Sequence, residues 1–286
     1  MTPQVFTPQE LEPILKIASD CGMTLIGGQA IGCWATLLEN PEEEPWKSRR
    51  PYTSRDADEL CTEIQMRRFA KALCQNGWSV EVFEPDEREK KINTGAIRIG
   101  GMIGGLPRVL EMNLLKQLDG MSNQEIEETA MEIPIHQSLV RTMDTLRLLE
   151  SKVISLNTLD QIKRQDRNHL ILCCAAVEKL LLETGKGPGW PNAIKSAQRI
   201  IQNANSQIGL DTLKHFQINL LDSIPWVGWR QSSQPELQEF GKQEQPHRSE
   251  MTSKLQEIEE SQQWFANLQS KSRRESTTSE PPGSPV

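Results

Sequence analysis

The sequence lacks the features that mark a membrane or exported protein. Its 286 residues are 36% hydrophobic, and apolar stretches such as Leu170–Val177 are too short to span a bilayer. Residues 1–4 do not combine a basic region with a following apolar run, so we expect no signal peptide. A cytoplasmic protein that makes no membrane contact is therefore predicted.

Cysteine is sparse, and its spacing excludes the common metal-binding patterns. The six cysteines form neither a CxxC pair nor a Cys/His ligand set. Cys173 and Cys174 are adjacent within an apolar helical pattern. We predict that these two thiols are reduced and buried.

The sequence has no excess of basic charge. Lys and Arg number 32 against 39 Asp and Glu, which gives a formal net charge of −7. This balance argues against a broadly basic nucleic-acid-binding surface but leaves a local basic groove open. The cluster at residues 47–50 (KSRR) could contact nucleic-acid phosphates, although the acidic run at 42–44 makes a self-neutralising loop an equal alternative.

The hydrophobic periodicity changes partway along the chain. Apolar residues at helical spacing predict an opening helix over Pro8–Cys21. Short β-like runs then alternate with helical stretches and glycine turns, and from Leu139 onward the strand pattern is absent. The predicted strands are 23–26, 78–83, 96–99, 108–115 and 132–135, and helices are predicted over 144–156 and 159–182.

These patterns predict an α+β protein in three segments. Residues 1–185 form a domain with a small mixed β-sheet, flanking helices and a helical subdomain. The breaker cluster Gly185–Pro191 marks its boundary. Residues 186–269 are predicted to be an accessory helical region, and the polar, proline-rich residues 270–286 a disordered tail.

A glycine pair followed by an aspartate pair is the segment that points most clearly to chemistry. An apolar strand leads into Gly27-Gly28 and then a helix, so the backbone can approach a phosphate and direct helix amides at it. Asp56 and Asp58 are two apart on an extended segment, so both carboxylates share a face and can hold Mg²⁺. A third carboxylate from a neighbouring strand would complete a site in which metal bridges a triphosphate and activates a hydroxyl. Either motif alone is more often a plain turn or an exposed strand.

The order of these motifs resembles the nucleotidyltransferase superfamily that shares the DNA polymerase beta-like palm. Within it, Gly27-Gly28-x-Ala30 followed by Ser54-x-Asp56-x-Asp58 is most similar to the bacterial group that includes AbiEii-type toxins. Two later segments, 149–152 (LESK) and 163–166 (KRQD), resemble the helical signature of that group. The resemblance covers about residues 10–182.

The resemblance implies a Mg²⁺-dependent enzyme that transfers a nucleoside monophosphate from a nucleoside triphosphate to a hydroxyl acceptor. The toxin relatives further imply RNA as a candidate acceptor and an antitoxin as a candidate partner protein. The implied catalytic residues are Asp56, Asp58 and Glu111, and the implied metal ligands are these three and Asn113. The implied nucleotide-binding residues are Gly27, Gly28, Ser54, Lys152, Arg164 and Asp166.

The sequence departs from the family pattern at two positions. Asn113 stands where the family has its third aspartate, and Glu111 lies two residues earlier on the same strand face. We favour Glu111 as the third acid. Glu59 stands where the family usually has an apolar residue, which puts the end of that strand in doubt.

The helical residues leave further alternatives open. Lys152 lies beside an apolar helix face, where its ammonium would need an anion such as a triphosphate, or it is solvated. Asp166 could orient Arg164 or Lys163, and we interpret His169 as structural.

Three functions fit the sequence. The first is nucleotide transfer to RNA, to a protein or to a small molecule, and the low basicity counts modestly against RNA. The second is a binding or regulatory protein on a catalytically weakened scaffold, which Asn113 favours and the intact Asp56/Asp58 pair opposes. The third is a structural protein whose C-terminal helices carry the interaction.

Overall fold

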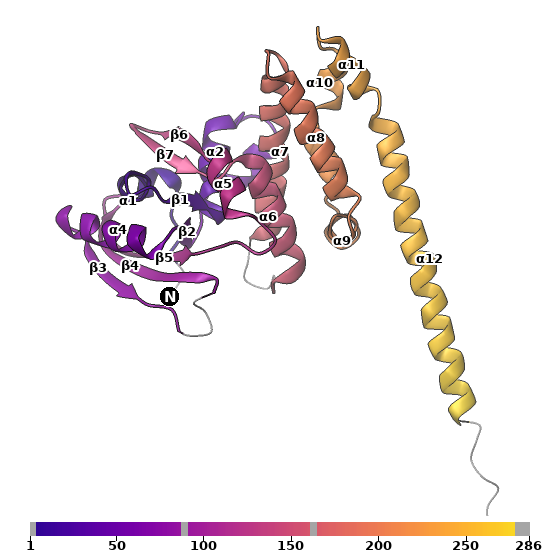
Figure 1. Cartoon of the computed structure of the whole chain (residues 1–286), viewed down its shortest axis with the longest axis horizontal. Helices are drawn as coiled ribbons and strands as arrows, with labels where there is room; N and C mark the ends of the chain where they lie inside the picture. Colours follow the sequence, from indigo (N-terminus) through magenta and orange to yellow (C-terminus); the bar gives the residue numbers. More distant parts are fainter. Residues whose placement is uncertain (1–3, 87–90, 161–164, 278–286) are drawn as a thin grey trace, which may run out of the picture.

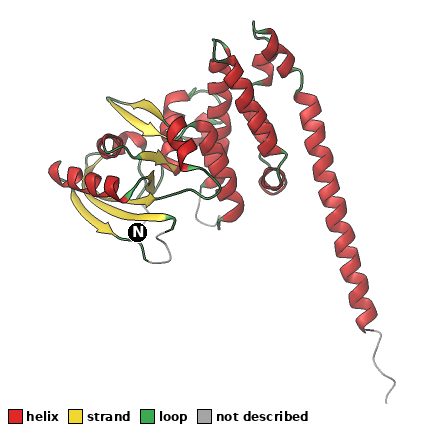
Figure 2. Cartoon of the chain, viewed as in Figure 1, coloured by secondary structure: helices red, strands yellow, loops and turns green. Residues whose placement is uncertain are grey.

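The structure, a computed structural model, describes residues 4–86, 91–160 and 165–277. It has the predicted α+β architecture, in which a mixed β-sheet with flanking helices is followed by a helical C-terminal region (Figures 1 and 2). Across the described ranges, no helix has both the length and the apolar character that crossing a lipid bilayer requires.

Seven strands form one sheet in the order β3-β4-β5-β2-β1-β7-β6. The pairs β2–β5 and β1–β7 are parallel, and the other neighbours are antiparallel. The strands are β1 Thr24–Ile26, β2 Asp56–Leu60, β3 Ser79–Phe83, β4 Asn93–Ile103, β5 Leu106–Leu115, β6 Met131–Ile135 and β7 Ser138–Thr142.

The hydrophobic pattern located five of these strands, the aspartate motif indicated β2 as an extended segment, and β7 was missed. The predicted runs correspond to β1, β3, β4, β5 and β6. β7 lies at the point where the strand pattern of the sequence ends, and it pairs with β1 through Leu25 and Thr142. Its five residues become a strand because they lie between β1 and β6, a partnership that local periodicity does not reveal.

Three helices of the N-terminal part pack against this sheet: α1 Pro8–Asp20, α2 Gly27–Leu38 and α4 Glu63–Gln75. Two shorter helices, α3 Trp46–Arg49 and α5 Asn123–Thr129, lie in the connecting segments. The predicted apolar face of α1 is buried. A capping box begins α1 at Thr7 and another begins α4 at Thr62, which satisfies the first free amides of both helices.

The second half of the chain is helical. Figure 1 shows α6 and α7 beside the sheet, α8 and α9 beyond them, and α12 extending away from the rest of the molecule. The elements are α6 Thr145–Thr158, α7 Asp166–Gly185, α8 Trp190–Ala204, α9 Gln207–Phe216, the 3₁₀ helix η1 Leu220–Ser223, α10 Trp226–Arg230, α11 Pro235–Gly241 and α12 Glu244–Thr277.

The C-terminal helices share one core with α6 and α7. α7 ends at Gly185, where a boundary was predicted, but Trp229 and Leu237 pack closely on this glycine. Across the same boundary, the Arg199 guanidinium binds the Glu150 carboxylate. A continuous hydrophobic cluster joins both sides.

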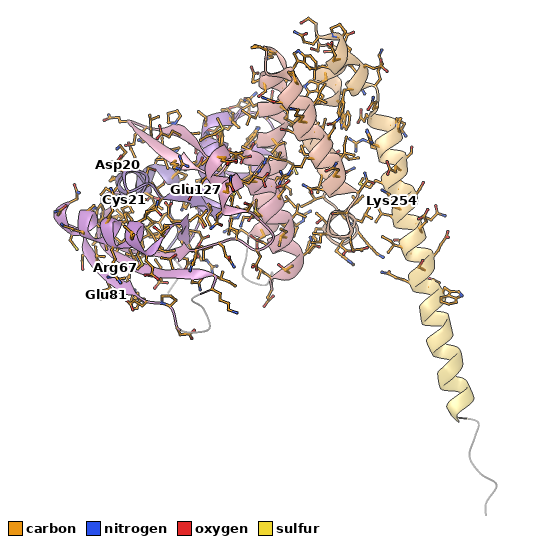
Figure 3. All side chains as sticks on the ribbon, viewed as in Figure 1. Asp20, Cys21, Arg67, Glu81, Glu127 and Lys254 are labelled. Atoms are coloured by element: carbon orange, nitrogen blue, oxygen red, sulfur yellow. The ribbon has the colours of Figure 1, made fainter. Side chains whose placement is uncertain are left out.

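The final helix contacts the rest of the chain near its beginning. Met251 is buried, and Lys254, labelled in Figure 3, donates to Asn205 Oδ1 at 3.2 Å. α12 continues to Thr277 and so enters the segment predicted to be a disordered tail from Ser270. Residues 278–286 lie outside the described part.

Cys173 and Cys174 are buried in α7 as free thiols, as predicted. Burial raises the pKa of Cys173 to about 12 and that of Cys174 well above its usual value. Both thiols therefore stay protonated near neutral pH and act as small apolar side chains.

Candidate functional site

The glycine pair forms an abrupt strand-to-helix junction. β1 ends at Ile26 and α2 begins at the next residue, Gly27, whose φ is +68°. A Cβ atom at Gly27 would collide with the Asp58 carboxylate, so both conformation and space require glycine there. At Gly28, a Cβ would lie 2.8 Å from His169 Cε1 and 2.9 Å from Ser54 Oγ. The N-terminus of α2, which has no side-chain cap, therefore lies beside Asp58 and Ser54, and a helix N-terminus of this kind suits an anion.

The two aspartates lie beside this turn on the strand next to β1. Asp58 is in register with Ile26 of β1, and Asp56 lies two residues earlier on the same face of β2. Ser54 Oγ donates to Asp56 Oδ1 at 3.3 Å. The predicted convergence of the glycines with Ser54, Asp56 and Asp58 is therefore present in the structure.

The two candidates for the third position have different surroundings. Asn113 is in register with Asp58, and its Nδ2 donates to Asp58 Oδ1 at 2.9 Å. Glu111 is in register with Asp56, but its carboxylate is 2.9 Å from Arg98 Nη2 and its side chain is 67% exposed. The difference comes from β4, which places Arg98 next to Glu111 and Ala96 next to Asn113.

Lys152 and Asp166 form a buried ion pair between α6 and α7. Lys152 Nζ lies 2.9 Å from Asp166 Oδ1, and the two side chains are 7% and 2% exposed. Lys152 is therefore not a solvated surface lysine, and its anion in this structure is Asp166. The predicted alternative partners of Asp166, Lys163 and Arg164, lie outside the described residues.

A cavity of about 290 Å³ joins these groups. It brings together the predicted Gly28, Ser54, both aspartates, Asn113, Lys152 and Asp166. Glu111 is not among its lining residues. Three further lining residues, which the sequence reasoning did not assign to the site, are Arg55, Gln165 and His169.

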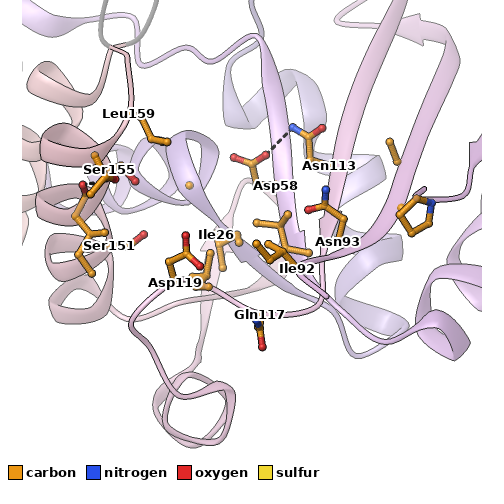
Figure 4. Close-up of a pocket in the computed structure, with 18 of the residues that line it drawn as sticks. Ile26, Asp58, Ile92, Asn93, Asn113, Gln117, Asp119, Ser151, Ser155 and Leu159 are labelled. Atoms are coloured by element: carbon orange, nitrogen blue, oxygen red, sulfur yellow. Dashed lines mark hydrogen bonds between the residues drawn. The ribbon is translucent and has the colours of Figure 1, made fainter. Parts of the chain in front are cut away.

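A larger cavity of about 500 Å³ adjoins the first and shares Asp58, Asn113 and Lys152 with it. One wall is a row of register partners across the sheet. The opposite wall is α6, from which Ser151 and Ser155 face the Asp58–Asn113 pair (Figure 4). The row runs through Phe83, Ala96, Asn113, Asp58 and Ile26.

The size of this cavity lies within the range of small-ligand pockets. Asn93 and Asp119 add polar groups to its lining. Neither residue belongs to a recognisable motif, so only the strand pairing and the packing of α6 could reveal them.

The donor set around the aspartates fits Mg²⁺ better than a dedicated protein-only metal centre. Among the described residues, no three His, Cys, Asp or Glu side chains are grouped closely enough to hold a metal ion. Mg²⁺ commonly binds through one or two carboxylates and takes its remaining oxygens from water and substrate phosphates. Asp56 and Asp58 supply such a pair.

Glu59 is an ionisable residue in the core behind the aspartates. The strand continues through it to Leu60, and its side chain lies on the opposite face from Asp58 with 1% exposure. Its Oε2 atom has no hydrogen-bond partner within the described chain. Burial, reinforced by the Asp58 charge, raises the pKa of the Glu59 carboxyl well above its usual value.

This environment predicts that Glu59 makes stability depend on pH. Because the pKa is higher in the folded state, folded protein binds this proton more tightly than unfolded protein does. Stability should therefore fall as pH rises above the ordinary glutamate pKa, by at most about 1.4 kcal/mol per pH unit until the folded-state pKa is reached. Glu59→Gln should remove this decline, as measured by thermal unfolding of both proteins from pH 5 to 9.

Glu132→Gln, at an exposed strand position, is the matched control and should retain the wild-type slope. Parallel pH profiles for wild type and Glu59→Gln would contradict a buried, protonated Glu59.

Comparison with known proteins finds no matching family model and no matching curated protein. Among solved structures, the chain is similar to an antigenic nucleotidyltransferase-like protein from Paracoccidioides brasiliensis, with 12% identity and a TM-score of 0.39 over 68% of this chain and 95% of that chain. It is also similar to JHP933 from Helicobacter pylori, with 13% identity and a TM-score of 0.39 over 91% of this chain and 95% of that chain. Superpositions this loose do not place the chain in a family, so we infer its function from the geometry of the site.

Proposed function

We propose that this protein is a nucleotidyltransferase that moves a nucleoside monophosphate from a nucleoside triphosphate to a hydroxyl acceptor. The observation that carries the proposal is the meeting of Asp56 and Asp58 with the N-terminus of α2 in one cavity. Carboxylates for a metal and helix amides for phosphate are the two elements that phosphoryl transfer needs. The adjoining cavity of about 500 Å³ offers space for the nucleoside.

The acidic residues and the backbone amides of the site would have different roles. Asp56 and Asp58 would hold Mg²⁺, which when bound neutralises phosphate charge and supports the attacking oxygen. The amides of Gly27 and Gly28 would bind phosphate oxygens. In the transfer, the acceptor oxygen forms a bond to the α-phosphorus. The bond between the α-phosphorus and the oxygen that bridges it to the β-phosphate breaks, so pyrophosphate leaves. The hydroxyl proton passes to water. Positioning and charge neutralisation supply most of the rate in such reactions.

The acceptor and any partner protein belong to the same proposal. RNA, a protein or a small molecule can each provide a hydroxyl, and an antitoxin partner follows only from the resemblance to AbiEii-type toxins. A direct test is to incubate the purified protein with each labelled nucleoside triphosphate and Mg²⁺, with and without total RNA. Label transferred to RNA, to the protein or to a small product identifies the acceptor. Complete absence of transfer, despite nucleotide binding, would exclude the enzyme.

The contact between Asn113 and Asp58 favours a second candidate, a nucleotide-binding or regulatory protein with weak turnover. An amide attracts a cation only through its dipole, whereas a carboxylate adds a full charge. The Asn113 amide also occupies one Asp58 oxygen. A site built this way would bind a metal–nucleotide complex more weakly than a site with three acids.

Asn113→Asp therefore tests how complete the site is. Because position 113 touches Asp58 and lines both cavities, the new carboxylate should strengthen Mg²⁺-dependent nucleotide binding by about tenfold. Glu111→Gln should have a much smaller effect, since Glu111 is exposed and paired with Arg98. Calorimetric titration with a nucleoside triphosphate and Mg²⁺ measures both.

If Glu111→Gln changes Mg²⁺-dependent nucleotide binding much more than Asn113→Asp does, Glu111 is the third acid, as the sequence suggested. Tenfold stronger binding together with new transfer activity in Asn113→Asp would favour the weakened-scaffold function for the native chain.

A further inference from the structure

A second polar cavity of about 290 Å³ shares Gly28 with the aspartate cavity. It is formed between α2, the loop that contains α3, and α7. Gly28, Gln165 and His169 line both this cavity and the aspartate cavity, so the two are immediate neighbours. The remaining polar lining consists of Ser48, Arg49, Arg50, Tyr52, Thr53 and Asn168.

The two neighbouring cavities have opposite charge. The first is lined by three aspartates, at positions 56, 58 and 166, and by Arg55 and Lys152. Because Lys152 pairs with Asp166, the excess negative charge comes from Asp56 and Asp58. The lining of the second contains two arginines and hydrogen-bond donors but neither Asp nor Glu. A cavity of this composition attracts an anion, whereas the first cavity attracts a cation.

Arg49 provides the less compensated of the two positive charges. The carboxylate nearest its guanidinium, Glu44, is 3.8 Å from Nη1 and 63% exposed. Nη1 donates to Pro45 O and Ser48 Oγ, while the buried Nε–H has no acceptor among the described residues. The guanidinium therefore has spare hydrogen-bonding capacity, and as a lining residue of the cavity Arg49 can offer its charge to an anion there.

Arg50 is already neutralised. It forms a two-point ion pair with Glu39, which also accepts a hydrogen bond of 2.7 Å from Tyr52 Oη. Trp46 and Tyr52 are buried and pack edge to face, with ring centroids 6.5 Å apart. These contacts hold the loop against the protein and fix the position of Arg49. Arg50 is thus neutralised by Glu39, which lies outside the acidic run 42–44. From that run, the ion pair that reaches the basic cluster 47–50 is the long one between Glu44 and Arg49.

We propose that this second cavity is a phosphate-binding site in which Arg49 supplies the charge. The ligand is a phosphate or diphosphate group. It could be the β- and γ-phosphates of the nucleotide or a phosphate carried by the acceptor. The link to either source rests on the proposed function, but phosphate binding itself does not, because neither Mg²⁺ nor turnover is needed for it.

The test is calorimetric titration of the full chain with pyrophosphate in the presence of EDTA. Without a metal, Asp56 and Asp58 repel the anion, so binding reports on the second cavity. Arg49→Gln should weaken binding on the order of tenfold or more, because a charge-assisted hydrogen bond is lost, and Arg49→Lys should retain part of it. Lys47→Gln is the matched control: it makes the same charge change in α3 at a residue outside the cavity lining.

Two further arms separate this site from the catalytic one and identify the source of the phosphate. Asp58→Asn should keep or strengthen pyrophosphate binding while losing Mg²⁺-dependent nucleotide binding. Competition between pyrophosphate and nucleoside triphosphate assigns the site to the nucleotide, and simultaneous binding assigns it to the acceptor. Equal pyrophosphate affinity in wild type, folded Arg49→Gln and Lys47→Gln, or no pyrophosphate binding at all, would overturn the proposal. Phosphate binding without any nucleotide transfer would instead reject the proposed function alone.

Discussion

Asp58→Asn should abolish Mg²⁺-dependent nucleotide transfer while leaving the fold intact. The substitution removes the carboxylate that lies against the Gly27 turn. This carboxylate lines both the aspartate cavity of about 290 Å³ and the adjoining cavity of about 500 Å³. Loss of a metal-holding carboxylate removes several kcal/mol of transition-state stabilisation, which corresponds to a rate decrease on the order of 10³-fold or more. The measurement is label transfer from the nucleoside triphosphate at saturating Mg²⁺.

The fold should survive because the new amide has nearly the shape of the carboxylate. Its oxygen can still accept the hydrogen bond from Asn113 Nδ2. Thermal unfolding checks this point. Asp20→Asn, at an exposed surface ion pair with Lys16, is the control for removal of one negative charge and should keep full activity. Unchanged transfer by Asp58→Asn would show that the chemistry takes place elsewhere.

Lys152→Met should strongly destabilise the protein. The ammonium of Lys152 is buried against Asp166, so the substitution removes a hydrogen-bonded cation from a carboxylate that is only 2% exposed. Breaking a buried ion pair from one side costs about 3–5 kcal/mol. For a protein of this size, that cost lowers the Tm by roughly 10 °C, as scanning calorimetry would measure.

A double variant separates the structural role of Lys152 from a role in nucleotide binding. Lys152→Met combined with Asp166→Asn removes both charges and should recover much of the lost stability. Lys152 also lines both cavities at the aspartates, so a direct contact with phosphate predicts that nucleotide affinity stays low in the stable double variant. Recovery of both properties would make the lysine purely structural. An unchanged Tm in the single variant would contradict the buried pair.

Local patterns were sufficient where a local cause decides the structure. The apolar spacing of α1 predicted its buried face, and the glycine pair after β1 predicted an abrupt turn into a helix. Two aspartates at i and i+2 share a face on any strand, so their common orientation on β2 followed directly from the sequence.

Pairing between distant segments lay beyond those patterns. β7 became a strand through its contact with β1. The choice between Glu111 and Asn113 depended on β4, which brings Arg98 to the glutamate and a small alanine to the asparagine. The spacing of residues 111 and 113 predicted that both side chains lie on the same strand face. It could not predict which residue of β4 would lie beside each of them.

The sequence by itself determined the α+β class, the strand–glycine–helix turn and the paired aspartates, because periodicity and backbone geometry act over a few residues. Only the tertiary structure decided that Lys152 pairs with Asp166, that Glu59 is buried, and that Arg49 lines a cavity beside the aspartates. Each of these outcomes depends on which charges and apolar surfaces meet across the fold. Burial and ion pairing arise from contacts between segments that are distant in the sequence, and residue spacing along the chain does not encode them.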